Sequence, residues 1–235
     1  PFKNLFTQGM VCHETYKDQN NNWLYPEEID KIDSISALKK SDKSKVIIGP
    51  PESMSKSKKN TIDPETMIDQ YGADAVRWFI LSDSPPEKDV QWSNTGVSAA
   101  NKFLQKIWNL NISVTKREEK KFNNPIQEKF IFEINTYISK IDQAINSFRF
   151  NVAVANFYET YSLFRKAIDL DIENITIKEN IIKIMKLLIP FIPHLAQECL
   201  ELHQAKNIEE WPIIEKNLKS KIKMAIQING KTRDI

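Results

Sequence analysis

The chain has 235 residues, of which 41% are hydrophobic and 10% aromatic, a composition that supports a hydrophobic core and one or two domains. Its 33 basic and 31 acidic residues give a net charge of +2, so any basic footprint for nucleic acid must be local. The two cysteines are too few for a disulfide framework, and no apolar run approaches the roughly 18 to 20 residues that span a bilayer. We therefore expect a cytoplasmic protein with no membrane partner.

The first quarter of the chain predicts a small unit rich in strands. Residues 5–11 are typical of a strand, and residues 14–25 of a hairpin around a polar turn. Residues 29–45 are rich in lysine and serine with scattered Ile and Leu, which indicates an exposed surface loop. The apolar residues 46–48 predict a short buried strand, which Gly49-Pro50-Pro51 should break.

Helices are predicted from residue 63 onward. Asp63 is a suitable capping residue, Pro64 suits the first helical position, and Gly72 should end this helix. Asp74 is expected to cap the next helix. Asp74 and Arg77 are also three residues apart, a spacing that favours an ion pair within the helix over a contact with RNA.

The remainder of the chain predicts a helical bundle. A further helix precedes a mixed-charge linker at residues 116–121. Apolar residues at helical spacing then mark four helices in all: Val97, Leu104, Ile107 and Trp108; Phe130, Ile134, Ile138, Ile141, Ile145 and Phe148; Val154, Phe157, Tyr161, Phe164 and Ile168; Ile181, Met185, Leu188 and Ile189. Residues 190–194 should interrupt the last of them, and another helix should run from Pro193 to about His203.

The basic segment Ser53-Met54-Ser55-Lys56-Ser57-Lys58-Lys59-Asn60 is the main candidate site. It connects the strand at residues 46–48 to the helix after Asp63, a position at which α/β proteins often place ligands. It contains no glycine, so lysine ammonium groups and serine hydroxyls, rather than backbone amides, would bind phosphates. The alternative is a solvated basic loop with no ligand.

A metal site is not expected. Cys12-His13 and the group His194, Cys199 and His203 are the candidates, and Cys199 and His203 share one helical face. A zinc site needs three or four ligands in compact pairs, and this spacing does not supply them. Burial and packing are the favoured interpretation of these residues.

Met54-Ser55-Lys56-Ser57 resembles the KMSKS signature loop of the class I aminoacyl-tRNA synthetases, with Ser53 in place of the first lysine. The residues that follow in the leucyl, isoleucyl, valyl and methionyl branch also have counterparts here: Asn60, Asp63-Pro64, Tyr71-Gly72-Ala73-Asp74 and Arg77. Lys58-Lys59-Asn60 is similar to the leucyl enzymes, since the other three usually carry glycine before the asparagine. The chain is thus identified as similar to leucyl-tRNA synthetases of the bacterial type, over nearly its whole length.

The end of the chain carries a second resemblance. Met224, Ile226 and Ile228 alternate as in a strand, and Asn229-Gly230 is a strong hairpin signal whose return strand we expect to be cut off. Residues 228–234 resemble the opening of the small C-terminal domain of bacterial leucyl-tRNA synthetases.

The resemblance implies roles for individual residues. Lys56 would be the catalytic residue, stabilising the charge on the ATP phosphates, and the rest of the ATP-binding loop would be Ser53, Met54, Ser55 and Ser57. The segment with Gln8, Gly9 and Met10 would lie near the adenylate. Contacts with tRNA are expected from four basic residues: Lys58, Lys59, Lys231 and Arg233.

The resemblance also implies an architecture, a mixed α/β remnant of a Rossmann-type catalytic domain followed by a mainly α-helical bundle like an anticodon-binding domain. The expected divisions are the catalytic part at 1–62, a stem-contact-fold-like connector at 63–115, the bundle at 116–220, and the truncated start of the C-terminal domain at 221–235. The chain opens on Pro1, which suggests an excised fragment.

The implied activity is that of a leucine–tRNA ligase with leucine, ATP with Mg²⁺ and tRNA(Leu) as partners, and with no metal held by the protein. We expect a monomer. The fragment lacks the HIGH motif and the editing domain, so it should be inactive alone. Two alternatives stay open: a non-catalytic module that binds structured RNA, and a synthetase of the isoleucyl, valyl or methionyl type.

Overall fold

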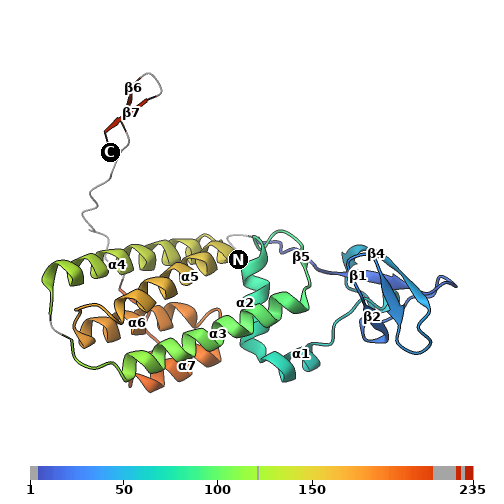
Figure 1. Ribbon diagram of the computed structural model, residues 1–235, viewed down its shortest axis with the longest axis horizontal. Coiled ribbons are helices and arrows are strands. Elements are labelled where there is room, and N and C mark those ends of the chain that lie inside the picture. The colour runs from blue at the N-terminus through green and yellow to red at the C-terminus, as the bar shows by residue number, and fades with distance from the viewer. Residues whose placement is uncertain (1–4, 121, 214–225, 229–230, 235) are drawn as a thin grey trace.

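The computed structural model describes residues 5–120, 122–213, 226–228 and 231–234. A small curled sheet lies at one end of an elongated molecule and a helical bundle lies at the other, with helices α1 and α2 between them (Figure 1). This arrangement confirms the predicted fold class of a partial α/β unit followed by a helical bundle. Within the described residues, none of the helices combines the length and the apolar character needed to cross a membrane.

The sheet contains five strands in the order β2-β3-β4-β1-β5. Their bounds are Val11–Lys17 for β1, Ile29–Lys31 for β2, Ala37–Lys39 for β3, Lys45–Ser53 for β4 and Val90–Gln91 for β5. All neighbours pair antiparallel except β1 and β5, which are parallel. Its small core consists of five residues: Tyr16, Leu24, Ile29, Ala37 and Val46.

Three predictions in this region are wrong. Residues 5–10 have no regular structure, and β1 begins only at Val11. Residues 29–45 are not an exposed loop, because β2 and β3 form there and bury Ile29 and Ala37. The scattered apolar residues of this segment fill the small core, which their spacing along the chain does not reveal.

The third error concerns β4. Gly49-Pro50-Pro51 does not break the strand, which continues to Ser53, and Ile47 is 59% exposed where burial was expected. The register between β1 and β4 shifts between His13 and Thr15, opposite the two prolines. Such an irregularity accommodates residues that have no N–H to donate to the ladder. The predicted hairpin at 14–25 is supported by the bridge between Lys17 and Trp23.

Seven α-helices follow within the described residues: α1 Pro64–Tyr71, α2 Ala73–Asp83, α3 Asn94–Thr115, α4 Asn124–Asn146, α5 Phe150–Ala167, α6 Asn174–Leu188 and α7 Pro193–Leu202. The predicted start of α1 is confirmed, since the Asp63 carboxylate accepts hydrogen bonds from the N–H groups of Glu65 and Thr66. Gly72 ends this helix with a φ of +82°, a value that suits glycine.

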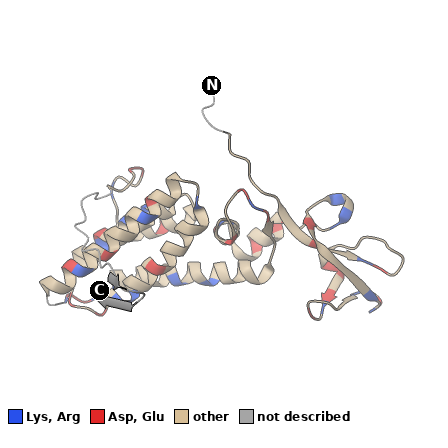
Figure 2. Cartoon of the chain, turned by 90° about the horizontal axis from the view of Figure 1, so that it is seen from above, with Lys and Arg blue, Asp and Glu red and all other residues tan. Residues whose placement is uncertain are grey.

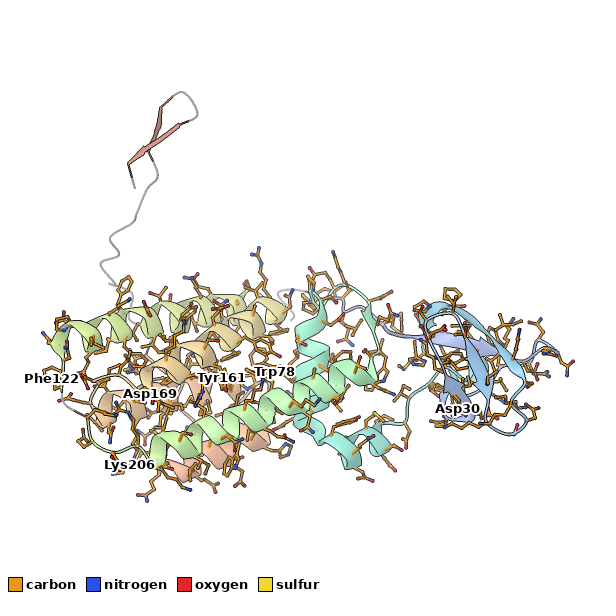
Figure 3. All side chains as sticks on the ribbon, in the orientation of Figure 1. Asp30, Trp78, Phe122, Tyr161, Asp169 and Lys206 are labelled. Atoms are coloured by element: carbon orange, nitrogen blue, oxygen red, sulfur yellow. The ribbon has the colours of Figure 1, made fainter. Side chains whose placement is uncertain are left out.

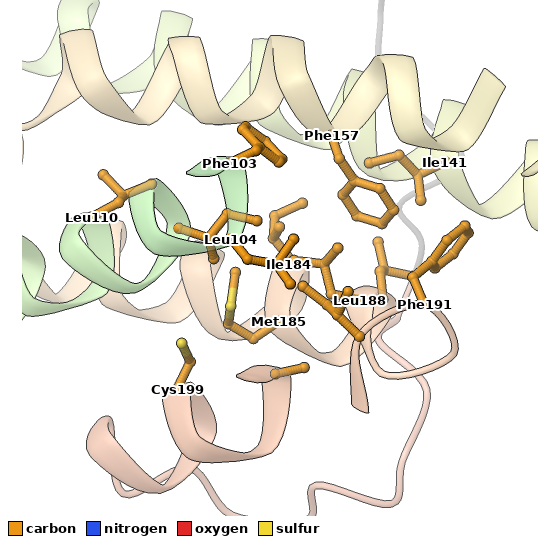
Figure 4. Packing of buried hydrophobic residues seen from close by; sticks show 14 of the residues in the cluster. Phe103, Leu104, Leu110, Ile141, Phe157, Ile184, Met185, Leu188, Phe191 and Cys199 are labelled. Carbon is orange, nitrogen blue, oxygen red and sulfur yellow. The ribbon is translucent and has the colours of Figure 1, made fainter. Parts of the chain in front are cut away.

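Helix α2 is part of the bundle core. Trp78 of α2, labelled in Figure 3, is fully buried. The centre of its ring lies 5.4 Å from that of Phe103 of α3 and 6.0 Å from that of Phe157 of α5. Figure 4 shows Phe103 of α3, Phe157 of α5, Leu188 of α6 and Phe191 of the turn after α6 converging on one interior. Apolar area removed from water stabilises this arrangement at about 25 cal/mol per Å², so α2 is held firmly to the bundle.

The roles expected of Asp74 and Arg77 need correction. Asp74 neither caps α2 nor pairs with Arg77, since its carboxylate accepts hydrogen bonds from Leu195 N–H at 2.7 Å and bonds His194 Nδ1 at 3.0 Å. Arg77 donates to the carbonyls of Pro190 and Phe191. Both side chains therefore hold the turn between α6 and α7. His194 has a structural contact, with Asp74, but its side chain is 76% exposed, so the burial expected of it is wrong.

Two short strands lie near the C-terminus. β6 (Ile226–Ile228) pairs antiparallel with β7 (Lys231–Asp234). The return strand expected to be cut off is therefore present, with four residues. Met224 and the turn residues Asn229-Gly230 lie outside the described residues.

Candidate functional site

The predicted phosphate loop follows the carboxyl end of β4 and leads into α1, so its position as a strand-to-helix connection is confirmed. Its centre is a single 3₁₀ turn, η2 (Lys56–Lys58). Ser55 caps this turn, because its Oγ accepts a hydrogen bond of 3.3 Å from Lys58 N–H. Ser57 Oγ lies 3.2 Å from Ser55 Oγ. The two serine hydroxyls therefore shape the turn from within.

Asn60 anchors the loop to the sheet. This residue is fully buried, and its Oδ1 accepts a hydrogen bond of 2.8 Å from Ser55 N–H. Its Nδ2 donates to the carbonyls of His13 at 3.2 Å and Glu52 at 3.0 Å. One amide thus ties both ends of the loop to β1 and β4, and a buried amide with this many partners rigidifies its surroundings.

The three lysines of the loop have different surroundings. Lys58 Nζ forms an ion pair with the carboxylate of Glu52, and Lys59 Nζ lies 5.1 Å from the centre of the Tyr25 ring. Lys56 is exposed, and among the described residues its ammonium group has no hydrogen bond, ion pair or ring contact. Lys56 is therefore the lysine of this loop whose charge is directed to solvent without a partner.

The backbone at Lys59 explains how the loop ends. Lys59 has φ +54° and ψ +22°, the left-handed conformation that closes the 3₁₀ turn. This conformation is costly for a residue with a Cβ and free of that cost for glycine. The left-handed backbone therefore constrains which residues fit at the end of this loop.

Met54 connects the loop to the helices behind it. Its N–H donates to Val11 O at 3.1 Å, and it lines an apolar cavity of about 300 Å³ with Val11, Met67, Val76 and Trp92. The cavity lies among β1, α1 and α2. Met54 therefore links the loop to apolar side chains of β1, α1 and α2.

The segment predicted to lie near the adenylate contacts residues 85–90. Gly9 N–H donates to Pro86 O at 2.8 Å, and Met10 N–H donates to Asp89 Oδ1 at 2.8 Å. A Cβ at Gly9 would lie 2.1 Å from Lys88 O, so the close approach of the two backbones requires glycine there. Gln8 and Gly9 line a cavity of about 320 Å³. Their part in binding an adenylate stays a prediction.

The remaining candidates lie away from the loop. Lys231 and Arg233 belong to β7, and contacts of these residues with tRNA stay a prediction. Among the described residues there is no group of three or more His, Cys, Asp and Glu that could hold a metal ion. Cys199 and His203 are buried in the bundle, where His203 Nε2 bonds Asn111 Oδ1 at 2.9 Å. Burial lowers the pKa of His203 to about 4.

Sequence reasoning missed Glu52 and Tyr25 as parts of the site. Neither residue belongs to a recognisable pattern with the lysines. Tyr25 is 34 positions from Lys59, and the fold alone brings its ring to the loop. Of the three residues that hold the loop and its lysines, Glu52, Tyr25 and Asn60, only Asn60 belongs to the recognised motif and carried a signal in the sequence.

Two models of known protein families match parts of this chain. A family model described as tRNA synthetases class I (I, L, M and V) matches residues 48–93, which include the loop. A second model, the anticodon-binding domain of tRNA ligase, matches residues 127–235, which include α5, α6 and α7. Leucine–tRNA ligase of Orientia tsutsugamushi is 41% identical over 248 aligned residues that cover 100% of this chain. The chain belongs to the leucyl-tRNA synthetase family.

Other relatives agree with this assignment. Leucine–tRNA ligase of Zymomonas mobilis is 38% identical over 100% of the chain. The chain spans 28% of the length of the Orientia relative and 27% of the Zymomonas relative, and it resembles a C-terminal portion of leucyl-tRNA synthetases. A leucyl-tRNA synthetase of Agrobacterium radiobacter K84, solved as a ternary complex with tRNA and LeuAMS, has a TM-score of 0.70 over 99% of this chain and 27% of its own length, at 22% identity. That likeness shows a shared fold.

Proposed function

We propose that this chain is the part of a leucyl-tRNA synthetase that presents Lys56 to the phosphates of ATP and supports tRNA(Leu) with its helical bundle. One observation carries the proposal: Lys56 is exposed and unpartnered among the described residues, in a loop that Asn60 fixes to the sheet. The match of residues 48–93 to the class I synthetases supports it.

In the proposed reaction the carboxylate of leucine attacks the α-phosphate of Mg-ATP, leucyl-adenylate forms, and pyrophosphate leaves. Negative charge accumulates on the phosphate oxygens as the bond to pyrophosphate breaks. The Lys56 ammonium group stabilises that charge by electrostatics, and no residue of this loop has to take a proton. Ser53, Met54, Ser55 and Ser57 complete the loop that binds ATP, with Met54 seated on the apolar cavity.

The bundle is the proposed support for the body of tRNA(Leu). Basic and acidic residues are both scattered over the bundle (Figure 2), so contacts with phosphates would be local. Lys231 and Arg233 are the proposed contacts at the C-terminal end, and Lys58 and Lys59 at the loop. Lys58 forms an ion pair with Glu52, and Lys59 lies over the Tyr25 ring, so both lysines are less available to RNA.

The decisive experiment joins this chain to the upstream portion of a leucyl-tRNA synthetase relative and measures leucine-dependent ATP–pyrophosphate exchange. Lys56→Ala should slow exchange about 100-fold, a loss of about 2 to 4 kcal/mol of transition-state stabilisation. Lys43→Ala, which removes an exposed lysine of the same small sheet, is the matched control and should keep the parent rate. An unchanged rate in Lys56→Ala would refute the role of Lys56.

The substrate and the fragment are tested in parallel. Exchange supported by isoleucine, valine or methionine instead of leucine would refute the leucyl assignment of the activity. The chain alone should form no adenylate and exist as a monomer. Detectable exchange by the 235-residue chain would contradict the first expectation, and light scattering tests the second.

A further inference from the structure

We infer that Glu52 and Tyr25 are positioning residues of the phosphate loop. Glu52 holds Lys58 and Tyr25 holds Lys59. A polyphosphate therefore meets a single available ammonium group, that of Lys56. The inference rests on the proposed function of Lys56. It assigns a role to two side chains outside the recognised motif.

The position of Glu52 is fixed independently of its carboxylate. Glu52 lies in β4 opposite His13, and its carbonyl accepts a hydrogen bond of 3.0 Å from Asn60 Nδ2. Its carboxylate pairs with Lys58 Nζ, while the N–H of Lys58 is held by Ser55 Oγ. Strand, turn and ion pair thus direct Lys58 back toward the sheet.

Tyr25 is also held in place from its backbone. Its N–H donates to Glu28 Oε2 at 2.7 Å, at the start of the 3₁₀ turn η1 (Pro26–Glu28). The Lys59 ammonium group lies 5.1 Å from the ring centre, within the range of a cation–π contact. The left-handed backbone of Lys59 ends the loop at this contact.

The physical consequence is that a triphosphate binds the loop in one preferred arrangement. Three equivalent lysines within four residues would let a triphosphate bind in several arrangements, of which only some align the reacting phosphate. Exposed ion pairs and cation–π contacts are weak, so each partner should change the availability of its lysine by a factor of about 2 to 5. The effect is a bias toward Lys56 and leaves the other lysines able to exchange partners.

The test uses inorganic tripolyphosphate as the probe and follows the amide signals of residues 55–60 of the chain by NMR at low salt. Lys56→Ala should weaken binding at least tenfold. Glu52→Gln frees Lys58 and should tighten binding about 2- to 5-fold. Asp30→Asn is the control, because it releases Lys43 from a more exposed ion pair with the same change of net charge, and it should leave binding unchanged.

Comparing Glu52→Gln in the parent and in Lys58→Ala distinguishes two roles of Glu52, holding Lys58 in position and repelling the phosphate directly. If Glu52 acts by holding Lys58, Glu52→Gln should tighten binding in the parent and have no effect in Lys58→Ala. Equal tightening in both backgrounds would mean that the Glu52 carboxylate repels the phosphate directly, and would overturn the inference. No tightening in either background would also overturn it.

Tyr25 is tested in the same way. Tyr25→Phe keeps the ring and should bind tripolyphosphate like the parent, whereas Tyr25→Leu should tighten binding about 2-fold. The effect of Tyr25→Leu should disappear in Lys59→Gly. Persistence of that effect without Lys59 would refute the role of Tyr25. An unchanged affinity in Lys56→Ala would instead refute the proposed function, whatever the other variants do.

Discussion

Asp74 of α2 accepts a hydrogen bond of 2.7 Å from the backbone N–H of Leu195, 121 residues further along the chain, in the first turn of α7. Helix α7 has no capping bond from its own preceding residue, Ile192, whose side chain cannot accept one. The carboxylate of α2 therefore satisfies a donor that would otherwise lack a partner at this helix end. The unit that follows the phosphate loop is joined to the bundle through this cap.

Removal of the cap should destabilise the protein. Asp74→Ala should lower the free energy of unfolding by about 1 to 2 kcal/mol, because Leu195 N–H loses its acceptor near a buried junction. Asp74→Asn keeps an acceptor oxygen and should cost less. Urea unfolding measures both, with the exposed Asp69→Ala as the control. Equal stability of Asp74→Ala and Asp69→Ala would contradict the capping role.

Asn60→Ala tests the anchor of the phosphate loop. The variant leaves Ser55 N–H and the carbonyls of His13 and Glu52 without this partner. We expect a loss of about 2 to 3 kcal/mol in the stability of the sheet, since unpaired buried groups cost about 1 to 3 kcal/mol each. Hydrogen exchange at Ser55 N–H reports the change directly. Ser57→Ala should leave that exchange rate near the parent value.

Two substitutions of one lysine isolate the backbone cost at the end of the loop. Lys59→Gly and Lys59→Ile both remove the contact with Tyr25, but only glycine adopts φ near +54° without strain. Lys59→Ile should be less stable than Lys59→Gly by about 1 to 2 kcal/mol in thermal unfolding. If the two variants melted together, the left-handed conformation would not be a constraint of this turn.

His203 should make stability depend on pH. Its Nε2 bonds Asn111 Oδ1, while its buried Nδ1 has no hydrogen-bond partner among the residues that the structure describes, so protonation would place an unpaired charged donor in the core. Burial, with a smaller contribution from the charge of Lys178, lowers the pKa of His203 to about 4 in the folded protein. The unfolded chain binds this proton near pH 6.5, so the contribution is present above that pH and is lost as the pH falls toward 4.

The measurable result is the dependence of the free energy of unfolding on pH. Between pH 7 and pH 5 the free energy of unfolding should fall by about 2 kcal/mol more in the parent than in His203→Gln, which cannot titrate. Urea unfolding at the two pH values provides the comparison. The pKa of His13 is also lowered by burial, but His13 is present in both proteins and cancels. Parallel pH profiles would show that His203 does not titrate in this window.

Much of this protein follows from local sequence. Apolar spacing placed the bundle helices, Asp63 and Gly72 marked the start and end of α1, and Met54-Ser55-Lys56-Ser57 located the loop. These features depend on residues within a few positions of one another, since helix contacts recur at three and four residues and caps bond the next turn. The sequence alone therefore determined the helices, the loop and the family resemblance.

Other features were decided only by the tertiary structure. The partners of Asp74 lie on α7. The segments β2 and β3 became strands because Ile29 and Ala37 complete a small shared core. Strand β4 continued through two prolines. The same holds for the choice among the three lysines of the loop. Tyr25 and the partners of Asp74 are far away in sequence, and Glu52, six residues before Lys58, lies on a strand that the turn of the loop folds back against. No local periodicity encodes a contact that arises when separate elements pack together.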